Sequence, residues 1–200
     1  MDRTRWMDAR EVRLLRATTE NAALHDQAAG RRGGPLRWLV VDLALSTGLR
    51  VGELAALTRS DIDLKRCSLR VTRLKRRKDC VETLALPTGL VAHIKAYMAA
   101  QSILEPSSPI LAGPRGRLSR QGIQRAWRRA IELAGLPAEL SIHCARHTMA
   151  VHLLAKTRNL RQVQKQLGHA SPTTTANMYA DVPWQDMAEG VEGLYDDKQD

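Results

Sequence analysis

The run LRWLVVDLAL at positions 36–45 constrains the fold more than any other feature of the sequence. It is apolar enough that, as a helix, it has to be buried among other elements. Gly48 is expected to end this helix, and Arg50 to begin a short helix directly after it. At 200 residues, the chain is long enough for one domain with a substantial core around such a helix.

Apolar residues at spacings of three and four predict further helices along the chain. They are expected over residues 88–101, 119–134, 142–156 and 159–167, with an opening helix in WMDAREVRLLRATTEN. Asn159 is the expected cap and Gly168 the expected stop of the helix over 159–167. The segment GRRGGP at 30–35 is rich in helix breakers, so it predicts a loop or hinge.

Two short segments alternate with period two instead. They are CSLRVTR at 67–73 and CVETLAL at 80–86, and they flank the charged stretch LKRRKD. This arrangement predicts a β-hairpin with a basic turn, which Pro87 ends. The expected fold class is therefore mainly α with a small antiparallel β-sheet.

Composition excludes several classes of protein. The sequence has no run of 18 uncharged apolar residues and no signal-like N-terminus, so we expect a chain with no membrane partner, in the cytoplasm. The cysteines Cys67, Cys80 and Cys144 lie far apart with no CxxC pair. They predict neither a disulfide framework nor a thiolate zinc site, and a reducing compartment fits them.

The net charge is unevenly distributed along the chain. It is +10 overall, but the last 20 residues carry −6, which leaves +16 on residues 1–180. A body that basic attracts polyanions, of which nucleic acid is the most common. The alternative at this point is that the charge serves solubility alone.

Several polar residues lie within segments that are predicted to form apolar helices. Arg50 and Glu53 lie three apart in STGLRVGELAAL, either as a structural ion pair or held inward to meet a charged group. His143 and Arg146 share a helix face with no carboxylate nearby in the sequence. His169, Tyr179 at the end of a predicted short helix, and Lys75 at the hairpin tip complete a set suited to an anion. His143 and His147 also have a spacing found in metal sites, but no third ligand follows, so no metal is expected.

Four segments, in this order, resemble the motifs of the tyrosine recombinases, also called phage integrases. They are TGLRVGEL, HCARHTMAVHLL, LGHAS and TTTANMY, and the resemblance spans roughly residues 8–182. It implies the tyrosine recombinase catalytic-domain fold over residues 1–182. It also implies cutting and rejoining of double-stranded DNA by a tyrosine, with no metal and no other cofactor.

The resemblance assigns roles to these polar residues. Arg50 and Arg146 would stabilise the charge that gathers on the phosphate oxygens in the transition state, with Glu53 orienting Arg50. Tyr179 would attack phosphorus, leaving a 3′-phosphotyrosyl bond and a free 5′-hydroxyl. His143 is the candidate base, and His169 would donate a hydrogen bond to a phosphate oxygen.

The hairpin would supply the remaining groups. The family protonates the leaving oxygen with a lysine of this hairpin, and here Lys75 and Lys78 are both available, with Lys75 the better fit as the residue closing the first strand. The residues expected to bind DNA, chiefly through its phosphates, are Arg73, Arg76, Arg77 and Lys78.

The resemblance also bears on organisation. The family's N-terminal DNA-clamping domain is absent from this chain. We expect either an excised catalytic domain, which the abrupt beginning favours, or a minimal protein with a weaker grip on DNA. Residues 183–200 form an acidic tail whose predicted helix, 184–195, would dock either on a neighbouring protomer or in cis. A monomer when free and a homotetramer on DNA are expected.

Two other functions share much of this pattern. One is a non-cleaving DNA-binding module that keeps only the basic groove. The other is relaxation of DNA by a type IB topoisomerase-like enzyme, whose cleavage chemistry is the same. The target sequence, and the choice among phage integration, transposition, plasmid resolution and cassette capture, stay open at this point.

Overall fold

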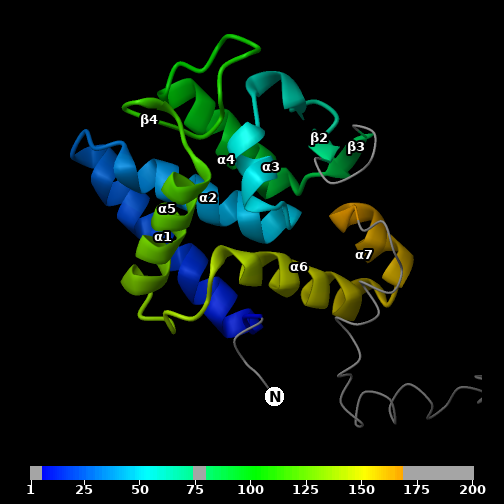
Figure 1. The fold of residues 1–200 in the computed structure, drawn as a ribbon. Helices are drawn as coiled ribbons and strands as arrows, with labels where there is room; N and C mark the ends of the chain where they lie inside the picture. The colour runs from blue at the N-terminus through cyan, green and yellow to red at the C-terminus, as the bar shows by residue number, and fades with distance from the viewer. Residues whose placement is uncertain (1–5, 74–79, 169–200) are drawn as a thin grey trace, which may run out of the picture.

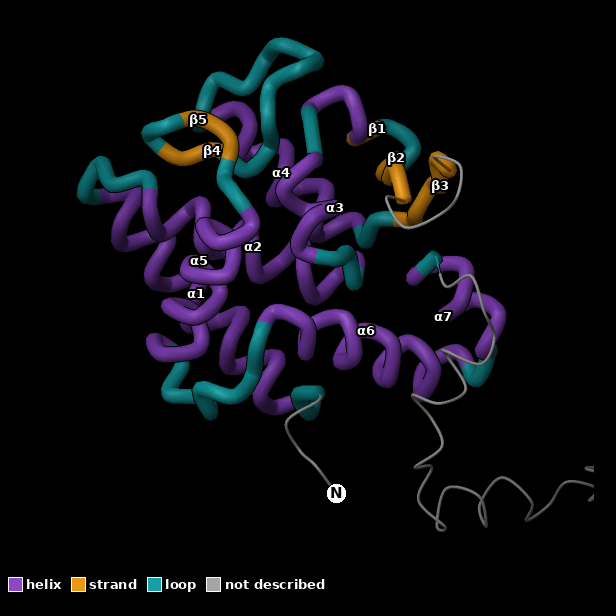
Figure 2. Tube along the Cα trace, in the orientation of Figure 1, coloured by secondary structure: helices purple, strands orange, loops and turns teal. Residues whose placement is uncertain are grey.

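The computed structural model describes residues 6–73 and 80–168, which form a cluster of helices with a small sheet at one side (Figures 1 and 2). The helices are α1 (Ala9–Ala28), α2 (Gly33–Thr47), α3 (Val51–Ala56), α4 (Thr88–Ala100), α5 (Arg120–Leu133), α6 (Ile142–Thr157) and α7 (Leu160–Leu167), with a 3-10 turn at Arg59–Asp61. The strands are β1 (Ile62–Asp63), β2 (Ser68–Arg73), β3 (Cys80–Ala85), β4 (Ala112–Gly113) and β5 (Gly116–Arg117). The predicted fold class is confirmed.

Helix α2 lies at the centre of this arrangement. It contacts α1, α4, α5 and α6, and every residue from Leu39 to Leu45 is buried. Because one helix is surrounded in this way, the apolar run at 36–45 has no solvent-facing stripe. Its burial, predicted from the sequence, is confirmed.

Three predicted helix boundaries are also confirmed. Gly48 (φ 63°) and Gly168 (φ 63°) both adopt the left-handed conformation, at the ends of α2 and α7. The side chain of Asn159 accepts hydrogen bonds from the backbone N–H groups of Arg161 and Gln162 at the start of α7. These two ends, at Gly48 and Gly168, bring free carbonyl groups toward the same part of the molecule.

The loop predicted at 30–35 is wrong in its extent. Helix α2 already begins at Gly33, because Pro35 falls in the first turn, where its missing N–H costs nothing. A Cβ atom at Gly34 would lie 2.7 Å from Asp26 Oδ2 and 2.9 Å from the carbonyl oxygen of Ala22. Gly34 therefore allows α1 to pack closely against α2, and it does not act as a hinge.

The predicted hairpin is confirmed. β2 and β3 pair antiparallel from Ser68 opposite Ala85 to Arg73 opposite Cys80, and the short β1 adds a third strand beside β2. β4 and β5 form a second, two-stranded pair within the segment 105–119, where only loop was expected. Two-residue strands leave too little periodicity to be read from a sequence.

A buried polar cluster ties α1, α2 and α4 together. Asp42 Oδ2 lies 2.9 Å from His93 Nδ1, and Asp42 Oδ1 accepts a hydrogen bond from Arg16. His93 in turn stacks on Trp38, with 3.6 Å between ring centroids. Burial alone would raise the pKa of Asp42, but the hydrogen bond with His93 and the charge of Arg16 outweigh it and hold that pKa below its usual value.

This lowered pKa predicts a loss of stability in acid. Because the folded-state pKa of Asp42 is depressed, its contribution is present above the unfolded value of 3.8 and is lost as the pH falls below it. We expect Asp42→Asn to cost about 2 kcal/mol at pH 7, since a charged hydrogen-bonded partner is lost, and less at pH 3, where part of the contribution of the Asp42 charge is already lost. Urea unfolding at both pH values measures this, with the exposed Glu105→Gln as control. An equal deficit at both values would contradict it.

Candidate functional site

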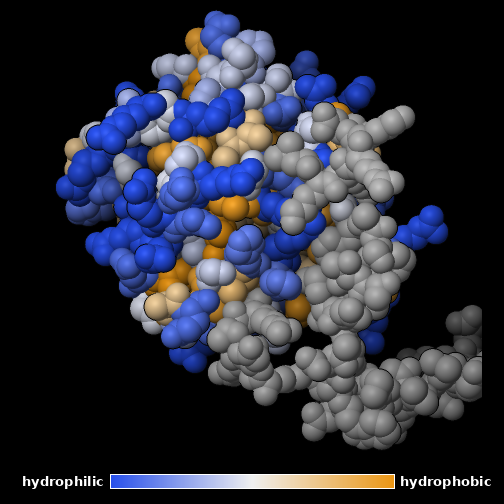
Figure 3. All heavy atoms as spheres, in the orientation of Figure 1, coloured by the Kyte–Doolittle hydropathy of each residue, from blue (hydrophilic) through white to orange (hydrophobic). Residues whose placement is uncertain are grey.

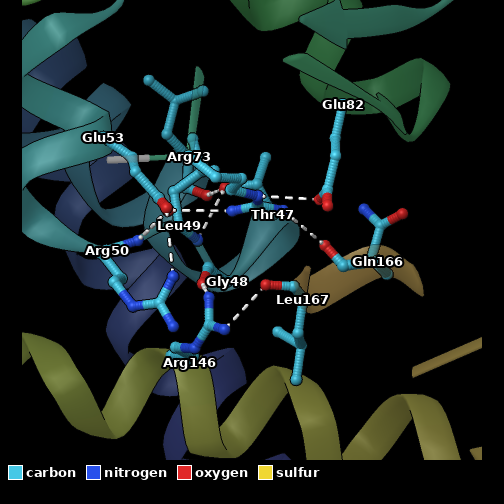
Figure 4. Close-up of polar contacts among 11 residues, drawn as sticks. Thr47, Gly48, Leu49, Arg50, Glu53, Arg73, Glu82, Arg146, Gln166 and Leu167 are labelled. Carbon is cyan, nitrogen blue, oxygen red and sulfur yellow. Dashed lines mark hydrogen bonds and ion pairs between the residues drawn. The ribbon is translucent and has the colours of Figure 1, made fainter. Parts of the chain in front are cut away.

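The site is centred on the start of α3, where Arg50 and Glu53 contact each other (Figure 4). Glu53 Oε2 accepts a hydrogen bond from the backbone N–H of Arg50 at 2.8 Å, and Glu53 Oε1 lies 3.2 Å from Arg50 Nη1. The Glu53 side chain is 3% exposed and that of Arg50 is 36% exposed. The first alternative posed by the sequence, a structural ion pair, is confirmed, and the arginine side chain also keeps one side open.

Arg73 lies at the end of β2 and joins the same carboxylate. Its Nη1 is 3.0 Å from Glu53 Oε2, and its Nε is 2.9 Å from Glu82 Oε2. The Arg73 side chain is only 3% exposed, because residue 73 falls on the same inward face of β2 as Leu69 and Val71. The prediction that Arg73 contacts DNA does not fit this placement: a buried guanidinium held by two carboxylates is turned away from a DNA surface.

Arg146 reaches the site from α6. Its Nη1 donates to the carbonyl oxygen of Gly48 and its Nη2 to that of Leu167, both at 2.7 Å. These carbonyls end α2 and α7, where the helix dipoles place partial negative charge. Arg146 therefore holds the ends of two helices beside Arg50 (Figure 4).

The charges of this cluster do not balance. Among the residues that the structure describes, Arg50, Arg73 and Arg146 carry three positive charges against the two negative charges of Glu53 and Glu82. Burial, followed by repulsion from Arg50, lowers the pKa of Arg146 to about 10. A group disfavoured in this way gains most from an anion brought next to it, so the geometry suits a bound phosphate.

The other predicted residues fall into two groups. His143 is exposed in the first turn of α6, one helical turn before Arg146. The remaining predicted site residues lie outside the described ranges: Lys75, Arg76, Arg77, Lys78, His169 and Tyr179. The predicted short helix carrying Tyr179 and the helix at 184–195 also lie outside them. The described chain leads into both segments, at Arg73 and at Gly168.

The sequence analysis missed Arg120, the first residue of α5. Its exposed side chain lies across α3: a Cβ atom at Gly52 would be 3.2 Å from both Nε and Nη2 of Arg120. Nearby, Arg117 Nη1 donates to the carbonyl oxygen of Ala55 at 2.9 Å. Charge alone could not select Arg120 among 31 basic residues, because its approach to α3 depends on a glycine two positions after Arg50.

The described residues contain neither a candidate metal cluster nor a candidate membrane-spanning helix. Within residues 6–73 and 80–168, no three His, Cys, Asp or Glu side chains are grouped so that they could hold a metal ion. None of the helices in those ranges is long and apolar enough to span a bilayer.

Comparison with known proteins decides the family. The profile of the phage integrase family matches residues 5–185, which include all four motif segments. The chain belongs to this family. Among curated integrases of the family, it is 32% identical over 191 residues to the tyrosine recombinase XerC of Alcanivorax borkumensis, covering 91% of this chain and 57% of that protein. It is 33% identical to the XerC of Rhizobium meliloti, covering 81% of this chain and 52% of that one.

Solved structures of integrases and recombinases share the fold. The XerA recombinase superposes with a TM-score of 0.73 at 24% identity, over 92% of this chain and 63% of that chain. The Tn1549 transposon integrase, solved in complex with transposon right end DNA, also gives 0.73, at 18% identity over 97% of this chain and 67% of that chain. The chain spans about half the length of the curated relatives that it matches.

Proposed function

We propose that this integrase is a site-specific DNA recombinase that cuts and rejoins DNA through a 3′-phosphotyrosyl intermediate, without metal or ATP. The observation that carries the proposal is the convergence of Arg50 and Arg146 in a buried cluster with one excess positive charge. Membership of the phage integrase family supports it. A scissile phosphodiester carries one negative charge, which matches the excess positive charge. Two of its oxygens can accept the parallel N–H groups of a planar guanidinium.

The chemistry follows from the placement of these groups. The transition state at phosphorus carries more negative charge on its nonbridging oxygens than the ground state does, so guanidinium groups fixed in advance stabilise it preferentially. Tyr179 attacks phosphorus, and the 5′-oxygen leaves with a proton from Lys75 or Lys78. Because the phosphotyrosyl ester conserves the energy of the broken bond, a second 5′-hydroxyl reverses the reaction on another strand.

Two histidines complete the proposed site. His143, exposed one turn before Arg146, takes the proton of Tyr179, whose ordinary pKa is about 10. His169, the residue after Gly168, donates a hydrogen bond to a phosphate oxygen. Both roles rest on the match of HCARH and LGH to the family motifs.

The proposal extends to partners. The substrate is double-stranded DNA, which Arg76, Arg77 and Lys78 of the hairpin tip contact through its phosphates. We propose a homotetramer on DNA and a monomer when free, in a prokaryotic cytoplasm, with residues 183–200 docking between protomers. Deletion after Asp181 is expected to weaken assembly; unchanged assembly and cleavage would remove the docking role.

The test is capture of the covalent intermediate. The chain is incubated in EDTA with end-labelled, nicked duplexes tiled over the DNA that flanks its coding sequence, and the products are run on a denaturing gel. A nick a few nucleotides to the 3′ side of the cleaved position lets the short fragment with the free 5′-hydroxyl diffuse away, so the adduct cannot be religated and accumulates. A shifted band that resists EDTA and yields a tyrosine-linked peptide on digestion supports the proposal.

Two outcomes favour the alternatives. Binding to these duplexes without an adduct favours a non-cleaving DNA-binding module. An adduct together with relaxation of supercoiled DNA, but without four-way junctions, favours a type IB topoisomerase-like activity.

Arg120 is expected to add a phosphate contact at the rim of the site. Its exposed guanidinium lies beside α3, and Figure 3 shows that the outer face of the molecule around α5 is largely hydrophilic. Arg120→Ala should weaken DNA binding at low salt and reduce the slope of log K against log salt by about 1.

Arg129→Ala is the matched control for Arg120→Ala. Arg129 lies nine residues further along α5, on the opposite side of the helix, and pairs with Glu132 at 3.1 Å. It is expected to leave the slope unchanged. Equal slopes for wild type and Arg120→Ala in a salt titration would rule out the contact.

A further inference from the structure

Arg73, at the end of β2, makes polar contacts with three other elements. Its Nη1 pairs with Glu53 of α3, its Nε pairs with Glu82 of β3, and its Nη2 points to the carbonyl oxygen of Gln166 in α7 at 3.4 Å. The planar guanidinium can serve all three directions at once because its N–H groups are fixed in a fork. In Figure 4 this fork lies between Glu53 and Glu82, facing Gln166.

One end of this connection sets the geometry of Arg50. Glu53 uses Oε2 for both the Arg50 backbone N–H and Arg73, and Oε1 for the Arg50 side chain. If Arg73 is lost, the Glu53 carboxylate has one positive partner instead of two and is free to rotate toward it. Arg50 would then lose the fixed direction from which it meets a phosphate.

The other end fixes the chain that leads to the last two motifs. A Cβ atom at Gly168 would overlap Arg73 Nε and Glu82 Oε2, so the ion pair lies directly against the residue that precedes His169. Gln166 Nε2 also donates to the carbonyl oxygen of Ala85 in β3, at 3.2 Å. The end of α7 is thus held against the hairpin by the Arg73–Glu82 pair and by a second hydrogen bond.

We propose that Arg73 is a positioning residue for DNA cleavage, whose buried guanidinium sets the direction of Arg50 through Glu53 and holds the chain entering the His169 segment through Glu82 and Gln166. This inference rests on the proposed function. It replaces the role of DNA contact for residue 73 with a role inside the protein. It also links the hairpin to Arg50 and to the chain that enters the His169 segment.

The test compares Arg73→Lys with wild type, because lysine keeps the buried positive charge but offers a single point of contact. Single-turnover cleavage of the nicked duplexes at saturating protein should fall about 30-fold, while Kd and its salt slope stay within twofold of wild type. Circular dichroism confirms that the variant is folded at the assay temperature. Arg70→Lys, an exposed position on the same strand, is the matched control and should cleave at the wild-type rate.

A double-mutant cycle separates positioning from a purely structural role. Arg50→Lys is expected to slow cleavage about 100-fold in the wild-type background but only about 10-fold in the Arg73→Lys background, because the orientation of residue 50 is already lost there. The inference would be overturned if Arg50→Lys slowed cleavage by the same factor in both backgrounds. An Arg73→Lys rate within twofold of wild type in folded protein would also overturn it.

The remaining outcomes separate a failure of this inference from a failure of the proposed function. A reduced salt slope with an intact rate at saturation would return Arg73 to DNA contact and overturn the inference. Wild-type protein that forms no adduct refutes the proposed function, and this inference with it. Wild-type protein that cleaves beside an equally active Arg73→Lys refutes the inference alone.

Discussion

Tyr179→Phe is expected to abolish the covalent protein–DNA adduct completely while leaving DNA binding intact. The substitution removes one oxygen atom, the nucleophile itself, and leaves the aromatic ring in place. Phenylalanine has no hydroxyl group with which to form the phosphotyrosyl ester, so no residual adduct is expected at any pH. The measurement is the denaturing-gel adduct assay in EDTA, beside a gel-shift titration of the same duplexes.

Tyr195→Phe is the matched control, because it removes the same atom from another tyrosine close to the C-terminus. It should form adduct as wild type does. Adduct formed by Tyr179→Phe would contradict the assignment and move the nucleophile elsewhere. Loss of DNA binding by the same variant would mean that the hydroxyl serves binding, and the adduct result would then carry no information on the nucleophile.

The fold was predictable where pattern and local chemistry agree. The apolar run in α2, the hairpin alternation, and the glycine and asparagine caps all depend on residues close together in the sequence. The segment at 30–35 was misread because Gly34 is explained by Asp26 and Ala22 of α1, which the local sequence does not bring into view. Breaker residues mark close packing as well as loops.

The candidate site was predictable in its motifs but not in its connections. Arg50, Glu53 and Arg146 could be singled out because charge in an apolar helix is unusual. Arg73 was assigned to DNA because it adjoins a basic turn, although its phase with Leu69 and Val71 already indicated an inward side chain. Its partner Glu82 is equally in phase with the buried Leu84. Two opposite charges on the inward face of a hairpin are the signal that could have revealed this pair.

Arg146→Lys is expected to lower the single-turnover cleavage rate about 1,000-fold, the second largest effect. Arg146 donates to Gly48 and Leu167 through two different nitrogens, and this bidentate hold fixes the plane of its guanidinium. A lysine ammonium cannot bond to both carbonyls and also face a phosphate in a fixed plane. The loss should fall on the rate at saturation and not on Kd, because many other basic residues contribute to binding DNA.

The same substitution should reduce stability. One of the two buried carbonyls, which end α2 and α7, loses its charged donor, at a cost of about 2 kcal/mol in the free energy of unfolding. Urea unfolding measures this loss, and the cleavage assay is run at a temperature where the variant is folded. Arg161→Lys, an exposed position in α7, controls for the exchange itself and should change neither quantity.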